Sequence, residues 1–162
     1  MRCRGALSVF IVVLFVAVVA PNVSARPLTE RALASARRNT ALIAAVNSVR
    51  SGHLLPRLSV DANLSRAARF HSRDMLLHDY FGHGDFAVRM LRFGVHGRVF
   101  AETLAWKRGV MSANATLATW LASPEHRSIL LDPALHRIGV ATPVGPFDGF
   151  ARATVITADF AG

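Results

Sequence analysis

The chain has 162 residues, of which 52% are hydrophobic, with a formal net charge of +9 and one cysteine, Cys3. A lone cysteine excludes an intramolecular disulfide framework, so an apolar core must stabilise the fold. The basic residues are spread along the chain without a dense block or interleaved aromatic residues, which argues against a nucleic-acid partner. A chain of this length accommodates one domain.

The first 25 residues have the pattern of a cleavable secretory signal peptide. Two arginines near the start precede an uncharged apolar run over residues 6–20, and Val23-Ser24-Ala25 supplies small residues for cleavage. The run is shorter than the roughly 20 residues that a helix needs to span a bilayer, so a membrane anchor is the less favoured alternative. We expect residues 1–25 to be removed and the mature protein to begin at Arg26. It would be secreted or periplasmic, without a stable membrane span.

The mature chain opens with a polar and basic segment, residues 26–39. Thr40 can then cap a helix from Ala41 to Ser51, which has apolar residues at helical spacing and ends before Gly52. A second helix is predicted from Asp61, a favourable N-cap, to about His78. Further helices are predicted over residues 86–93, 111–121 and 124–131. Ser112 is the expected cap of the second of these.

Two strands are predicted near the end of the chain, Arg137–Ala141 and Ala153–Asp159. The loop of residues 143–149 contains two prolines and two glycines and would join them as a hairpin. Helices that enclose a small sheet indicate an α+β layered domain. Trp120 and Phe160 each end an apolar-periodic segment, so we expect both side chains to be largely buried.

Four polar residues occupy positions where apolar residues would be expected. Glu102 lies in the apolar stretch of residues 100–105, and a buried carboxylate needs partners. Histidines are the candidates, because no lysine or arginine lies within three residues of Glu102. We predict that the four residues converge in one cleft with Glu102 nearest its centre; they are His71, His83, Glu102 and His126.

The same four residues are compatible with two uses. Buried polar residues are usually hydrogen-bonded to each other, which would make the set structural and would raise the pKa of the histidines beside the carboxylate. Histidine and carboxylate side chains also bind zinc, and Glu102 as a general base would then give a metal-assisted hydrolase. The short protease motifs His-Glu-x-x-His and Gly-x-Ser-x-Gly are absent from the sequence.

Six short blocks of residues follow one another in a specific order. They are Ala67-x-x-x-His71-Ser72-x-Asp74-Met75, Tyr80-Phe81-Gly82-His83, Arg89 with Gly94, Ala101-Glu102-Thr103-Leu104-Ala105, Trp120-x-x-Ser123-Pro124-x-His126-Arg127, and Ile138-Gly139-Val140. In this order they resemble the CAP superfamily of cysteine-rich secretory proteins, antigen 5 and plant pathogenesis-related proteins, in its bacterial, cysteine-free, SCP-like branch. The resemblance implies a compact three-layer α-β-α sandwich, with the CAP domain at residues 40–162.

Animal and plant members of the superfamily line a cleft with two histidines and two glutamates. The resemblance assigns His83 to one of the two histidine positions and Glu102 to one of the two glutamate positions, which makes them the candidate zinc ligands. The Gly-Glu-Asn block reads Ala101-Glu102-Thr103 here, the second glutamate position falls near Ser123, and the strand Thr154–Thr157 carries no histidine. Half of the tetrad is matched, and His71 and His126, from the bacterial blocks, could complete a site of different shape.

The resemblance also implies a function outside the cytoplasm. Members are secreted and are linked to lipid binding, host interaction and defence, without one general catalytic activity. We therefore expect a monomeric, non-enzymatic binding module for a lipid, glycan or peptide ligand, or for an envelope component. The metal-assisted hydrolase is the alternative, with zinc as its cofactor.

Overall fold

A computed structural model describes residues 28–162 of the chain. The predicted signal peptide and its cleavage position lie outside the described residues. The elements in chain order are α1 (Leu28–Gly52), β1 (Ser59–Val60), α2 (Ala62–His78), α3 (Phe86–Arg92), β2 (Phe100–Arg108), α4 (Ala113–Ala122), α5 (Pro124–Leu130), β3 (Arg137–Ala141), β4 (Val144–Phe147) and β5 (Phe150–Ala161). Within residues 28–162, no helix combines the length and the apolar character that a membrane span requires.

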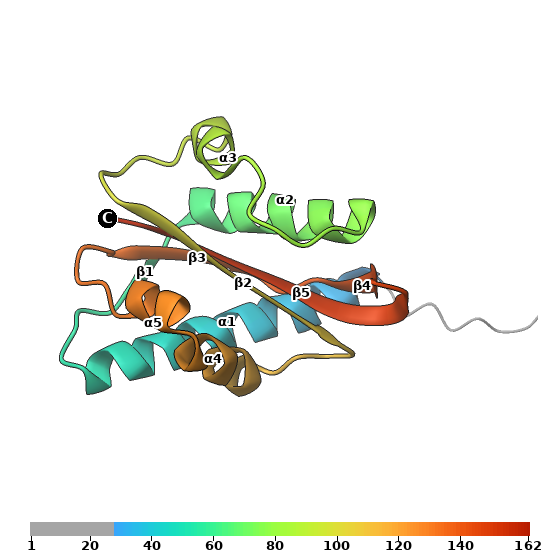
Figure 1. Cartoon of the computed structure of the whole chain (residues 1–162), viewed down its shortest axis with the longest axis horizontal. Helices are drawn as coiled ribbons and strands as arrows, with labels where there is room; N and C mark the ends of the chain where they lie inside the picture. Colours follow the sequence, from blue (N-terminus) through green and yellow to red (C-terminus); the bar gives the residue numbers. More distant parts are fainter. Residues whose placement is uncertain (1–27) are drawn as a thin grey trace, which may run out of the picture.

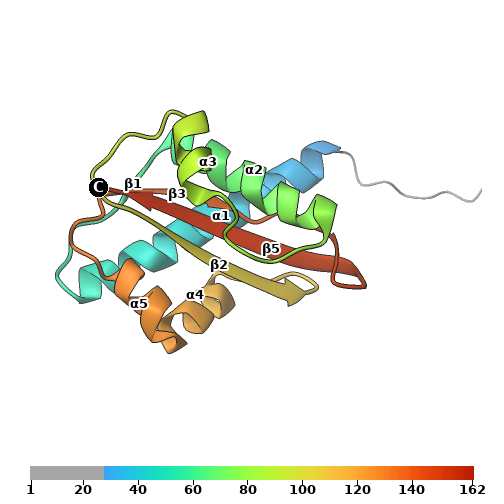
Figure 2. The ribbon, with the colours of Figure 1, turned by 45° about the horizontal axis from the view of Figure 1, so that its top comes forward.

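The sheet is organised around β5, which forms antiparallel pairs with β2, β3 and β4. The strand order is β1-β3-β5-β2, and β1 joins β3 in parallel. Helices α2 and α3 cover one face of the sheet, and α1, α4 and α5 cover the other (Figures 1 and 2). This arrangement confirms the predicted single-domain α-β-α sandwich.

The largest part of the core lies between the sheet and the layer of α1, α4 and α5. Trp120 from α4 and Phe160 from β5 are both fully buried there, as the sequence predicted. The indole Nε1 of Trp120 donates a hydrogen bond to the carbonyl of Leu104 at 2.9 Å, so α4 is fixed to β2 by a polar contact as well as by packing. A buried indole N–H needs such an acceptor.

Gly139 allows α2 to lie directly on β3. A Cβ atom at this position would lie 2.1 Å from the carbonyl carbon of Leu64 and 2.1 Å from the backbone nitrogen of Ser65. No side chain can occupy that space while α2 keeps its position. Asp61 fixes the start of the same helix, because its Oδ1 accepts hydrogen bonds from the backbone N–H groups of Asn63 and Leu64, as expected of an N-cap.

The first helix is longer than predicted. It begins at Leu28, so Thr40 lies inside it rather than at its cap, and residues 28–39 of the supposed basic segment are helical. The segment is rich in alanine and arginine, which favour helix without an apolar stripe. Arg38 donates to the carbonyl of Thr142, and the Thr142 hydroxyl donates to Asn39, so this part of α1 is attached to the connection between β3 and β4.

Three strands were not predicted. The stretch around Glu102 is the nine-residue strand β2, and the short strands β1 and β4 flank other elements. The predicted hairpin loop contains β4, which itself pairs with β5. The shorter predicted helices agree with the structure within a few residues, and Ser112 caps α4 as expected, since its hydroxyl accepts from the N–H of Ala115.

Candidate functional site

Glu102 is a buried carboxylate on the face of the sheet that α2 and α3 cover. It lies on β2 opposite Asp159 of β5 in the antiparallel register. Residues directly opposite each other in such a pair point to the same face. Both carboxyl groups therefore enter the layer between the sheet and helices α2 and α3.

The principal partner of Glu102 is an arginine, which corrects the prediction that histidines would be its nearest partners. The Nη2 of Arg89, from α3, donates to Glu102 Oε2, and Nη1 donates to the carbonyl of His83 at 3.0 Å. Arg89 is itself buried. The prediction considered only residues near Glu102 in sequence, whereas folding brings Arg89 of α3 onto Glu102 of β2. Arg89 belongs to one of the blocks that carry the resemblance, and that was the available signal.

His83 forms the second contact to Glu102. Its Nδ1 lies 2.6 Å from Glu102 Oε1, and 59% of its side chain is exposed. A neutral imidazole that donates its Nδ1–H to a carboxylate has Nε2 as its acceptor nitrogen. Glu102 therefore sets the orientation and the tautomer of an exposed histidine.

His71 lies on the inner side of α2 and is buried, as predicted. Its Nε2 is 2.8 Å from the carbonyl of Gly82, to which it donates, and 3.8 Å from Glu102 Oε2. Burial lowers the pKa of His71, and the opposing charge of Glu102 does not compensate. The expectation that pairing raises the histidine pKa is therefore wrong for His71, since desolvation is the larger effect.

His126 lies in the first turn of α5 and is half-buried. Its backbone N–H donates to the hydroxyl of Ser123, the helix cap, while its Nδ1 is buried without a hydrogen-bond partner among the described residues. Burial lowers the pKa of His126; Glu125 opposes this and the charge of His83 adds to it. The structure thus brings His71 and His83 to Glu102 and places His126 within electrostatic range of His83. That all four predicted residues line one cleft remains a prediction.

Asp159 belongs to the same cluster and was missed by the sequence analysis, which only ended a strand on it. It is fully buried, 3.9 Å from Arg89 Nη2. Burial raises its pKa well above the usual range, and the charge of Glu102 adds to this against the smaller effect of Arg89. When protonated, Asp159 can donate its O–H to Glu102; when ionised, it has no hydrogen-bond partner within residues 28–162. The sequence signal that could have identified Asp159 was a carboxylate within an apolar stretch, the same signal that identified Glu102.

The cluster does not fit a zinc ion held jointly by His83 and Glu102. Oε1 of Glu102 is taken by the Nδ1 of His83, and Oε2 is taken by Arg89. In the part of the chain described, no three His, Cys, Asp or Glu side chains are arranged to hold a metal ion. A guanidinium bound to the carboxylate also adds a positive charge where a cation would sit.

The fold is an α-β-α sandwich in which the buried Glu102 binds the exposed His83. The profile of the cysteine-rich secretory protein family, CAP, matches residues 43–160. The chain belongs to the CAP family.

Several bacterial proteins are similar to the chain. The uncharacterized protein YkwD of Bacillus subtilis is 31% identical over 99 residues, which cover 58% of this chain and 38% of YkwD. An extracellular protein with an SCP domain from Bacillus anthracis is 27% identical with a TM-score of 0.70, over 83% of this chain and 43% of that one. The chain therefore spans less than half the length of both proteins.

An outer surface protein of Borrelia burgdorferi shares the fold. Its TM-score is 0.63 at 19% identity, over 74% of this chain and 87% of that one. At this identity the likeness concerns the fold alone.

Proposed function

We propose that the protein is an exported, non-enzymatic binding module that acts in the envelope or outside the cell. The observation that carries this proposal is the state of Glu102, whose two oxygens are bound internally by Arg89 and His83. A carboxylate held in this way orients its neighbours and is not available to accept a proton from a substrate or water. The cluster therefore supports a rigid presentation of His83 rather than catalysis.

The contact group for the ligand is the exposed face of His83. Its Nε2 accepts hydrogen bonds from ligand hydroxyl or amide groups, and Phe81, two residues earlier, is 46% exposed. An aromatic ring beside a fixed polar group suits a ligand with both apolar and polar faces. Among lipid, glycan and peptide ligands, this favours a glycan or peptide of the bacterial envelope.

A titration with a soluble disaccharide-peptide fragment of peptidoglycan tests the proposal. In ¹⁵N–¹H spectra we expect the amide resonances of residues 81–84 to shift, and His83→Ala to weaken the affinity about tenfold, or about 1.4 kcal/mol. His53→Ala is the matched control, because His53 is also exposed but lies in the turn after α1. Absence of binding, or equal losses in both variants, would contradict the proposal, and so would cleavage of the fragment seen by mass spectrometry.

One observation favours the alternative, a metal-assisted hydrolase. A carboxylate bound to one nitrogen of a histidine is the usual support for a histidine that binds zinc through its other nitrogen. The Nε2 of His83 would then bind the metal, and Glu102 would only orient His83. Thermal melting with and without zinc decides this: a rise in melting temperature for the native protein, absent in His83→Ala, would favour the metal site.

Export itself is part of the proposal. The similar protein from Bacillus anthracis is described as extracellular. Residues 1–25 have the pattern of a signal peptide. N-terminal sequencing of protein recovered outside the cytoplasm should begin at Arg26, and an intact Met1 on membrane-bound protein would contradict this.

A further inference from the structure

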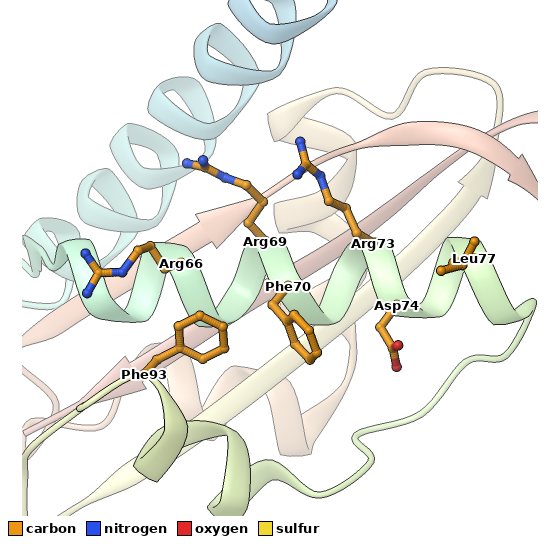
Figure 3. A pocket seen from close by; sticks show the side chains of 7 residues that line it. All are labelled: Arg66, Arg69, Phe70, Arg73, Asp74, Leu77 and Phe93. Atoms are coloured by element: carbon orange, nitrogen blue, oxygen red, sulfur yellow. The ribbon is translucent and has the colours of Figure 1, made fainter.

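We propose that the outer face of α2 is a docking surface for an acidic, amphipathic segment of a partner protein. This face bears a groove with a volume of about 360 Å³ between α2 and the end of α3 (Figure 3). We call it the arginine groove. Its lining residues are Arg66, Arg69, Phe70, Arg73, Asp74, Leu77 and Phe93.

A row of cations follows one side of the groove. Arg66, Arg69 and Arg73 are exposed and lie three and four residues apart, which places them along one side of the helix. At 1.5 Å per residue the row is about 10 Å long. Among the described residues, no carboxylate forms a salt bridge with any of the three.

The floor of the groove is apolar and remains partly uncovered. Phe70 is 38% exposed and Leu77 is 78% exposed, and the rings of Phe70 and Phe93 pack with their centroids 5.6 Å apart. Arg92 of α3 places its guanidinium 4.4 Å from the centroid of Phe70, which adds a fourth cation beside this floor. Phe70 and Leu77 therefore offer apolar contacts directly beside the charged row.

The one carboxylate in the lining does not neutralise this charge. Oδ2 of Asp74 accepts a hydrogen bond from the hydroxyl of Tyr80 at 2.6 Å, and Oδ1 lies 3.0 Å from Nδ1 of His78. Asp74 is thus engaged with the end of α2 and the segment after it. The arginines keep an excess of positive charge, so the occupant should be anionic.

The spacing of the cations favours a polypeptide as the occupant. Separate arginines along two turns of helix match carboxylates repeated along a second helix, and the adjacent groove accepts its apolar side chains. A bilayer presents its phosphates on a plane and would contact only the rim of a concave groove. A second copy of this strongly basic chain would bring like charges together. The groove is small, so the interaction should be weak and transient.

The arginine groove is separate from the proposed ligand contact at His83. The groove lies on the outer side of α2, whereas His71 on the inner side of the same helix faces the Glu102 cluster. The two proposals can therefore fail independently.

The test uses the purified protein and a fluorescent peptide of about 18 residues, long enough for five helical turns. The peptide carries a leucine stripe beside glutamates at i, i+3 and i+7, and fluorescence anisotropy measures its binding. We expect saturable binding that weakens with added salt, as screening requires. Arg69→Glu with Arg73→Glu should raise Kd at least tenfold, and Leu77→Ser should raise it several-fold.

Controls make the expected result specific. Arg57→Glu with Arg98→Glu produces the same change in net charge at exposed positions outside the groove, and it should leave Kd within twofold. A peptide with lysines in place of the glutamates should bind the Arg69/Arg73 reversal variant better than the native protein. Circular dichroism should show unchanged melting of every variant, because the substituted side chains are all exposed.

Four results would overturn the proposal. One is equal binding of a scrambled peptide, and another is an equal loss in the Arg57/Arg98 control. A third is co-sedimentation with phosphatidylglycerol vesicles that depends on Arg69 and Arg73 while the acidic peptide does not bind, which would assign the groove to a membrane surface. The fourth is a dimer in sedimentation experiments that Leu77→Ser abolishes.

Discussion

Glu102 and Asp159 face each other across the pairing of β2 and β5, so two buried carboxyl groups share one arginine. With both ionised, the trio would carry a net negative charge in a site removed from water. Arg89 contacts Glu102 directly and lies 3.9 Å from Asp159, so it is the nearer counter-ion of Glu102. Burial raises the pKa of Asp159 well above its ordinary value, and the charge of Glu102 raises it further.

Asp159→Asn should make the protein more stable at neutral pH. Since burial raises the folded-state pKa of Asp159, the folded protein retains a proton that the unfolded chain has released. The contribution of this group is therefore complete below the unfolded pKa of about 3.9 and is lost as pH rises toward the folded pKa. Asparagine does not titrate, so the variant does not lose this stability as the pH rises. We expect a gain of about 1 kcal/mol or more at pH 7, since one pKa unit corresponds to about 1.4 kcal/mol.

Urea unfolding of both proteins at pH 4 and pH 7.5 measures this gain. The difference between the variant and the native protein should grow as the pH rises. A difference that is constant over this range would show that Asp159 ionises normally.

Arg89→Met should be strongly destabilising, because it leaves Glu102 buried without its counter-ion and removes the donor to the His83 carbonyl. Breaking one side of a buried ion pair typically costs about 3–5 kcal/mol. Adding Glu102→Gln to Arg89→Met should recover part of that loss. Arg92→Met, at an exposed position in the same helix, is the control and should change the free energy of unfolding by less than about 1 kcal/mol.

Trp120→Ala should cost about 3–5 kcal/mol, because it empties a large, fully buried aromatic site. Trp120→Phe keeps most of the packing but removes the donor to the Leu104 carbonyl, with an expected cost of about 1–3 kcal/mol. Chemical denaturation of both variants gives the comparison. A loss below about 1 kcal/mol for the alanine variant would contradict the role of Trp120 in the core.

Gly139→Ala tests the contact between α2 and β3. The new methyl group would overlap the backbone at Leu64 and Ser65, so the helix must move as a unit. We expect a loss of about 3 kcal/mol or more, above the usual range for overpacking, because backbone rather than a flexible side chain is in the way. Gly82→Ala is the control, since no atom lies within 4 Å of the added methyl. Equal melting temperatures for both variants would exclude this close packing.

The sequence predicted those elements whose ends carry their own signals. Asp61 and Ser112 cap helices through hydrogen bonds to residues two or three positions away, so a short window contains the whole interaction. Strand β2 lacked such signals. Its central residues Glu102 to Ala105 are all buried, which removes the alternation of a half-exposed strand, and few are β-branched.

The site could be predicted in its residue types but not in its pairing. An inward histidine at position 71 and a carboxylate at position 102 follow from local patterns. Arg89 reaches Glu102 from α3, and Asp159 lies opposite Glu102 because of the strand register. Both relations join parts of the chain that only the complete fold brings together, and a single sequence contains no local trace of them.

The central position of β5 affects how the protein folds during synthesis and export. Strands β2 and β4 pair only with β5 among the described strands, and β3 otherwise has only the two-residue β1 beside it. A chain that emerges from a ribosome or a translocation channel from its N-terminus exposes helices and isolated strands until residues 150–161 appear. Sheet formation must wait for β5, so the strands assemble cooperatively only once residues 150–161 are present.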